Sequence, residues 1–197
     1  MDFQKIIERV KSILLSPKQA LEDVQGEDMT ISGTMKGYVM ILAAIPAIAH
    51  FIGSAIIGLP FVGRQNLGRT LIFAALSFGL SLAAVFIVSK VINALAPNFN
   101  SVKNDLNAFK LSVYFFTPFF VAGAFNLIPS LSILALLGSL YGIYILYIGL
   151  PILMKAPEDK VLVYTVVTLI LCLVVMLIVS FIAGAIAWGG SGPARYF

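Results

Sequence analysis

The sequence predicts an all-α membrane protein, a polytopic bundle of five transmembrane helices preceded by a short amphipathic helix. Of its 197 residues, 60% are hydrophobic and 11% are charged, whereas a soluble domain carries about 25% charged residues. The mean hydropathy is +1.01. The apolar residues gather in runs close to the roughly 20 residues that a helix needs to cross a bilayer.

The predicted bundle is organised around a helical hairpin at residues 109–154. Two apolar segments of near-bilayer length meet there at a short turn, residues 126–130, with the sequence NLIPS. Asn126 suits a cap or turn, and the proline and serine that follow suit the first turn of a new helix. A turn this short forces two antiparallel helices to pack side by side.

The other three spans are predicted at residues 34–58, 70–96 and 161–188. Polar loops are expected at 59–69 and 97–108, and a tight charged turn with the sequence KAPEDK at 155–160. Trp188 is expected to anchor the last span at the membrane interface. The glycine-rich tail, residues 189–197, is expected to be flexible.

The segment before the first span, residues 1–33, is expected to lie in the cytoplasm. Within it, residues 2–15 place apolar side chains at helical spacing opposite charged ones, as in an amphipathic helix. This helix suits either an anionic leaflet or the protein's own cytoplasmic loops, and the sequence does not choose. Ser16, Pro17 and Gln19 then predict a second helix, with Ser16 as a side-chain cap.

The distribution of lysine and arginine predicts the orientation. With the N-terminus in the cytoplasm, inner segments hold Lys5, Arg9, Lys11, Lys18, Lys36, Lys90, Lys103, Lys110, Lys155 and Lys160, and outer segments hold Arg64, Arg69 and Arg195. By the positive-inside rule this places the N-terminus in the cytoplasm and the C-terminus outside. No Asp or Glu falls within a predicted span, which argues against a proton- or sodium-driven carrier.

A few polar residues inside the spans are candidates for an intramembrane site. His50 lies four residues after Pro46, whose missing N–H leaves a backbone carbonyl free. Pro118 and Pro151 interrupt two further spans. Such breaks serve transport sites, but they are also common packing features, and His50 also suits an ordinary interhelical hydrogen bond. The candidate residues are His50, Thr117, Tyr114, Asn126 and Tyr144.

Small residues predict close helix packing at two places. Ala75, Gly79 and Ala83 recur every four residues in the second span, and Gly138 and Gly142 form a GxxxG motif in the fourth. Such strips let another helix approach closely. The partner helix belongs either to the same chain or to a second copy in a homo-oligomer.

Catalysis, metal binding and nucleic-acid binding are not predicted. The single cysteine, Cys172, excludes an intramolecular disulfide and a CxxC motif, and one histidine lacks the partners that a metal site needs. Gly189 to Gly192 spell the GxSG string of intramembrane serine proteases, but in a predicted tail without a supporting helix. The net charge of +4 fits cationic flanks of spans. No enzyme and no cofactor are expected.

Three stretches together resemble the Yip family of five-span membrane proteins, particularly its bacterial inner-membrane branch. They are LLSPKQALEDVQGED before the first span, YVMILAAIPAIAHFIG within it, and VYFFTPFFVAGAFNLIP followed by YGIYILYIGLPILMKAPEDKVLVYTVV. The resemblance covers about residues 10–185 and implies a Yip-like domain at 34–188, a cytoplasmic N-terminus and a bacterial inner-membrane location. Eukaryotic members are linked to Rab-type GTPases, but the DLYGP-like segment of those members is absent here, so the resemblance carries over neither Rab binding nor any functional residue.

The function predicted is that of a non-enzymatic membrane organiser or adaptor. Its partners would be membrane lipids and another membrane or cytoplasmic protein, because nearly every charge falls on one side. The alternative is a small transporter, channel or lipid-translocating protein with a site near His50 and the span prolines.

Overall fold

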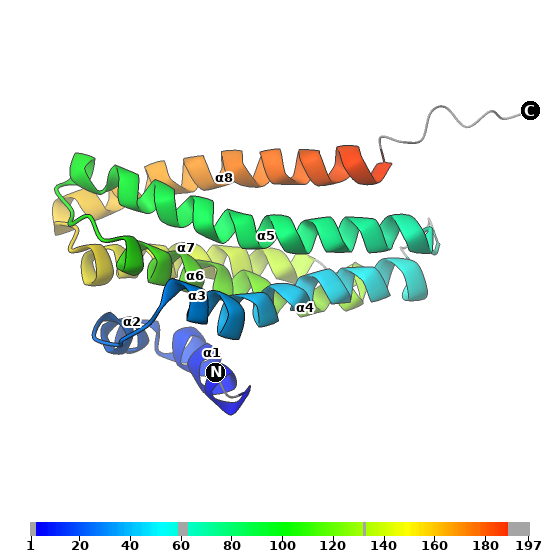
Figure 1. Ribbon diagram of the computed structural model, residues 1–197, viewed down its shortest axis with the longest axis horizontal. Coiled ribbons are helices and arrows are strands. Elements are labelled where there is room, and N and C mark those ends of the chain that lie inside the picture. Colours follow the sequence, from blue (N-terminus) through cyan, green and yellow to red (C-terminus); the bar gives the residue numbers. More distant parts are fainter. Residues whose placement is uncertain (1–2, 59–62, 132, 189–197) are drawn as a thin grey trace, which may run out of the picture.

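Five long helices lie side by side in the computed structural model (Figure 1). The structure describes residues 3–58, 63–131 and 133–188. The helices that are long and apolar enough to cross a membrane are Ile31–Ile57, Leu67–Phe99, Asp105–Leu127, Ile133–Met154 and Glu158–Ile182. The predicted all-α, five-span class is confirmed for the described residues.

Three of the spans are composite. The first joins α3 (Ile31–Thr34) to α4 (Met40–Phe51) through a π-helical turn, η1 (Met35–Val39), and continues into a second one, η2 (Ile52–Ile57). The second is α5 (Leu67–Leu95) with the 3₁₀ turn η3 (Ala96–Phe99). The third is α6 (Asp105–Ala122) with η4 (Gly123–Leu127). A short 3₁₀ turn, η5 (Pro129–Leu131), leads to α7 (Ile133–Met154) and then α8 (Glu158–Trp188).

Helix α6 is the centre of the bundle. In its most apolar stretch 67% of the residues are buried, against 22–39% in the other four spans. It packs against α4, α5 and α7, and buries Phe109, Leu111 and Phe120 completely or nearly so. The other spans each leave a broad apolar face outward, which suits contact with lipid tails.

The two N-terminal helices pack on the protein itself. Helix α1 (Phe3–Leu15) contacts α6, and α2 (Pro17–Gln25) contacts α7. Ile13, Leu21 and Val24 are fully buried in these contacts. The amphipathic helix therefore packs against the faces of span helices. Other apolar residues of α1, such as Phe3, are exposed.

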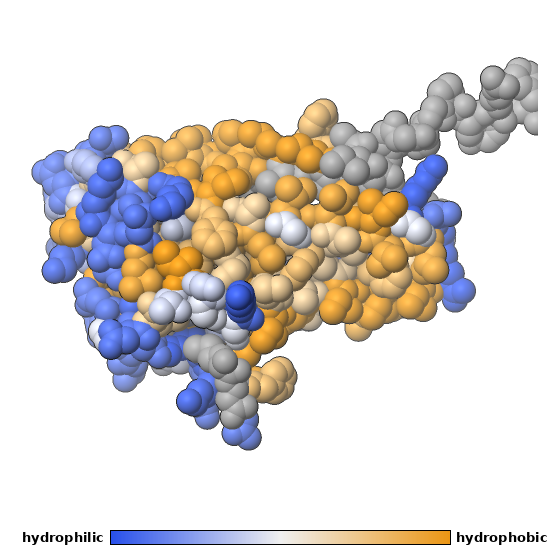
Figure 2. Space-filling view, viewed as in Figure 1, coloured by the Kyte–Doolittle hydropathy of each residue, from blue (hydrophilic) through white to orange (hydrophobic). Residues whose placement is uncertain are grey.

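The bundle has two chemically different ends. The N-terminal end holds α1, α2, the α5–α6 loop and the α7–α8 turn, and the remote end holds the α4–α5 and α6–α7 connections. Figure 2 shows hydrophilic residues massed at the N-terminal end and an apolar body beside it. Every carboxylate side chain among the described residues belongs to the N-terminal end, whereas the described cations of the remote end are Arg64 and Arg69.

Two local predictions are wrong. The expected loop at 97–108 is shorter, because the Asn104 side chain accepts the Asn107 N–H at 2.9 Å and starts α6 at Asp105. Ser16 makes no side-chain cap bond. Its N–H donates to Ser12 O at 2.9 Å and its own carbonyl accepts from Ala20, so the chain passes directly from α1 into α2. The expected tail, with its GxSG string, and the Trp188 side chain lie outside the part of the chain described.

Candidate functional site

A buried lysine fixes the N-terminal helices to the bundle. Lys110 lies on α6, is only 2% exposed, and donates from Nζ to Val24 O and Glu27 O at 2.8 Å each. Val24 belongs to the last turn of α2, and its carbonyl also accepts from the Glu27 N–H at 3.2 Å. A cation at a helix C-terminus also interacts favourably with the helix dipole. Lys110 thus joins the central span to the end of α2.

Further polar contacts hold α1 and α2 at the same end of the bundle. Arg9 on α1 donates to both carboxylate oxygens of Glu27, at 2.7 and 2.6 Å, and its side chain is 18% exposed. The Tyr141 hydroxyl on α7 donates to Leu14 O at 2.8 Å, which covers the end of α1. Helices α1 and α2 are therefore held by charge, hydrogen bonds and apolar burial together.

The C-terminus of α7 is capped by three different segments. Its last carbonyls accept hydrogen bonds from the Gln25 side chain at Ile152 O (2.7 Å), from the Asn107 side chain at Leu153 O (2.9 Å), and from the Val102 N–H at Met154 O (2.9 Å). A helix end normally leaves such carbonyls to water. Here α2, α6 and the α5–α6 loop satisfy them.

The predicted intramembrane residues separate into three groups. His50 and Asn126 line one cavity of about 190 Å³ between α4, α5 and the end of the third span, together with Pro46, Ser77 and other residues. The His50 ring packs on Phe73 with centroids 5.1 Å apart. His50 lies seven residues before Ile57, or about 10 Å along a helix, so the cavity belongs to the remote half.

Thr117 and Tyr114 belong to a different, closely packed cluster with Tyr38. The Thr117 hydroxyl donates to Val113 O at 2.9 Å, so Tyr38 is the donor in its 3.2 Å hydrogen bond with Thr117. Tyr114 meets Tyr38 edge to face at 6.0 Å and contacts Met29 Sδ at 3.9 Å. These buried polar groups have protein partners, as in an ordinary interhelical network.

Tyr144 lies apart from both groups. It is half exposed on α7, packs beside Tyr141 with centroids 5.8 Å apart, and borders a surface cleft with Ser16 and Lys18 of the N-terminal segment. Among the described residues, no three His, Cys, Asp or Glu side chains come together as metal ligands.

Of the two predicted packing strips, one is in close contact with another helix and the other is not. A Cβ placed on Gly142 would lie 2.5 Å from Phe115 O, and one on Gly138 would lie 2.6 Å from Pro118 O, so α6 and α7 approach closely at these glycines. Gly79 faces open space, Ala75 is exposed and Ala83 is half-buried. No helix of the described chain closes on Gly79.

Known proteins resemble this chain over most of its length. The Yip1 domain family model matches residues 11–188, which is most of the chain. The chain belongs to the Yip1 domain family. Among curated proteins, it is 28% identical over 180 residues to Inner membrane protein YohC of Escherichia coli K12, which covers 88% of this chain and 92% of the relative. YohC of E. coli CFT073 matches equally. No solved structure matches.

Several polar contacts that join the helices of this Yip1 domain chain involve residues that sequence patterns do not single out. The positive-inside pattern marks Lys110 only as an inner-side charge, and no motif marks Tyr38 or Gln25. One signal was available for Lys110: it stands between Phe109 and Leu111, among apolar neighbours. A lysine there needs partners from elsewhere in the fold.

Proposed function

We propose that this Yip1 family chain is a non-enzymatic, multi-pass inner-membrane protein that acts as an organiser or adaptor through its N-terminal end. The observation that carries the proposal is the fixed, charged surface of that end. Lys110 and the Arg9–Glu27 pair hold α1 and α2 against α6 and α7. A surface held in one arrangement loses less conformational entropy when it binds a partner.

The charges on this surface are available for recognition. The exposed ones include both signs on the first two helices and at the nearby turns, namely Lys5, Glu8, Lys11, Lys18, Glu22, Asp23, Lys103, Lys155, Glu158 and Asp159. Complementary charges steer partners and select among them. The larger number of lysine and arginine residues at this end supports a cytoplasmic position for it. The E. coli relative named an inner membrane protein supports the location in that membrane.

The transporter alternative has less support from the geometry. A transport site near His50 would be supported by Thr117 and Tyr144 in the same cavity, but Thr117 is hydrogen-bonded in the Tyr38 cluster and Tyr144 borders a surface cleft. The charged N-terminal surface therefore carries the functional proposal.

A charge-reversal experiment tests the adaptor function. The full chain is extracted from native membranes into polymer nanodiscs, and the co-purifying proteins are identified by mass spectrometry. Glu22→Lys with Asp23→Lys changes two exposed residues of α2 and leaves its buried face intact. Deletion of residues 1–26 is less suitable, because it would also remove Ile13, Leu21 and Val24 from the core.

The expected result is a stoichiometric protein partner that co-purifies with the wild type and is lost from the α2 variant. Arg64→Glu with Arg69→Glu reverses charge at the remote end and serves as the matched control, which should keep the partner. If no protein co-purifies stoichiometrically, or if the α2 variant retains it, the proposal is wrong.

A further inference from the structure

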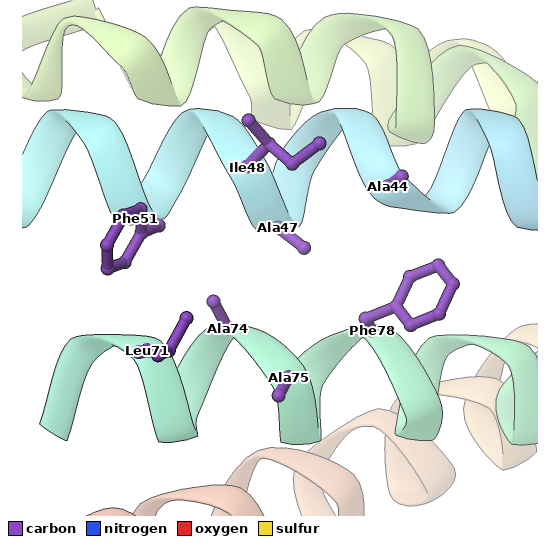
Figure 3. A pocket seen from close by; sticks show the side chains of 8 residues that line it. All are labelled: Ala44, Ala47, Ile48, Phe51, Leu71, Ala74, Ala75 and Phe78. Atoms are coloured by element: carbon purple, nitrogen blue, oxygen red, sulfur yellow. The ribbon is translucent and has the colours of Figure 1, made fainter. Parts of the chain in front are cut away.

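A groove opens between α4 and α5 in the remote half of the bundle (Figure 3). It holds about 300 Å³ and is lined by carbon alone, including Ala47, Ile48, Ala74 and Phe78. Ile48 is 56% exposed, so the groove opens to the outside of the bundle. On a membrane-spanning segment, this outside is the hydrocarbon of the bilayer.

The groove adjoins the polar cavity that contains His50. Ala47 and Ala74 line both spaces, so the groove and the cavity meet between α4 and α5. The cavity side presents the imidazole of His50, the hydroxyl of Ser77 and the amide of Asn126. Within the described chain, neither the His50 ring nor the Asn126 amide has a protein hydrogen-bond partner.

Polar side chains inside a span rarely stay without partners. An unsatisfied polar group in hydrocarbon costs several kcal/mol, because lipid tails offer no hydrogen bonds. His50 and Asn126 can both donate hydrogen bonds. The cleft as a whole therefore combines a place for an apolar chain with donors for an acceptor group beside it.

We propose that this cleft binds one phospholipid of the leaflet at the remote end. An acyl chain lies in the groove between Ile48 and Phe78, and an ester carbonyl accepts hydrogen bonds from His50 or Asn126. The described charges of the remote end are Arg64 and Arg69, both positive, so a phospholipid with an anionic headgroup fits that end best.

A lipid chain suits the groove better than a helix of a second copy. A helix is about 10 Å wide with its side chains, so it could insert only side chains between α4 and α5. A helix would lie over the groove and leave the His50 cavity unfilled. An unbranched chain is thin enough to enter, and its ester end supplies the missing acceptors.

Photo-crosslinking of the full chain tests the site. The protein is reconstituted in nanodiscs of phosphatidylethanolamine and phosphatidylglycerol that contain a phosphatidylglycerol with a diazirine in one acyl chain. Labelled residues are mapped by mass spectrometry. In the wild type, labels should concentrate on Phe51, Leu71 and Phe78 above the level of the lipid-facing residues of α8.

Two variants with matched positions complete the test. Ala75→Phe fills the groove from an exposed position, and labelling of Leu71 and Phe78 should fall about tenfold, as for a loss of 1.4 kcal/mol in affinity. Ile72→Phe adds the same ring to α5 at an exposed position that lines neither space, and should leave labelling unchanged. His50→Phe should weaken labelling by a similar factor to Ala75→Phe.

Several results would overturn the proposal. Uniform labelling of all lipid-facing residues in the wild type would indicate only the ordinary lipid annulus. This outcome is measured on the wild type alone and does not depend on whether a variant folds. Equal labelling in Ala75→Phe and Ile72→Phe would exclude the groove. Disulfide-linked dimers of an Ala75→Cys variant, formed in the same nanodiscs, would indicate that a second copy covers this face.

Discussion

The two ends of the bundle differ in how their polar groups are satisfied. At the N-terminal end, Lys110 and Gln25 reach carbonyls of other helices, and Arg9 pairs with Glu27. In the remote half, His50 and Asn126 face a cavity, and the described chain gives them no hydrogen-bond partner. The chain itself therefore satisfies the polar groups of the N-terminal end, whereas two polar side chains of the remote half face a cavity without a described protein partner.

The largest effect is expected from the lysine that closes the N-terminal end. Lys110→Met keeps the length and apolar stem but removes two charge-assisted hydrogen bonds, which should destabilise the fold by about 3 kcal/mol. Thermal unfolding in detergent measures this, and limited proteolysis should cut the segment that contains α1 and α2 faster. Lys103→Met changes an exposed lysine and is the control. Equal stability of the two variants would contradict the proposed role of Lys110.

Alanine substitutions at two glycines compare a closely packed helix face with an exposed one. Gly142→Ala would place a methyl group 2.5 Å from Phe115 O, and the overpacking should cost about 1–3 kcal/mol. Gly79→Ala meets open space, so it should leave stability unchanged or raise it by up to about 1 kcal/mol through helix propensity. Thermal unfolding of both variants measures the two changes in stability. A larger loss of stability for Gly79→Ala than for Gly142→Ala would contradict the prediction.

The ion pair at the N-terminal end should contribute less than Lys110. Glu27 is 39% exposed, so solvent screens its attraction to Arg9 and the coupling should be about 1 kcal/mol or less. A double-mutant cycle with Arg9→Gln and Glu27→Gln measures the coupling, which should shrink at high salt. A salt-independent coupling of several kcal/mol would show that the pair is desolvated in solution.

The smallest effect on stability is expected at His50. His50→Phe keeps an aromatic ring beside Phe73 and loses no described protein hydrogen bond, so unfolding in lipid-free detergent should change by less than about 0.5 kcal/mol. Thr117→Val, which breaks the Tyr38 network, is the contrast and should cost about 1–3 kcal/mol. A loss of stability for His50→Phe as large as that for Thr117→Val would mean that polar groups of the remote half are satisfied by the protein as well.

Local patterns along the sequence predict where the spans lie. The five apolar runs and the NLIPS turn were sufficient to predict the bundle, because span length and apolar composition are properties of consecutive residues. The expected start of α6 was late because the Asn104 cap extends the helix into polar sequence. The grouping of His50 with Thr117 and Tyr144 could not be checked from sequence, since helix rotation decides which face each residue presents.

Composition and periodicity along the chain were enough to predict the five spans, the family and the concentration of charge at one end, because these are properties of consecutive residues. Which polar groups have hydrogen-bond partners depends on the packed helices and is not visible in the sequence. Lys110 and Val24 stand 86 positions apart and yet share a hydrogen bond, and Gly142 and Gly79 look alike in sequence but lie against a backbone and in open space. Such outcomes depend on how helices rotate and pack against one another, which is set by the whole fold.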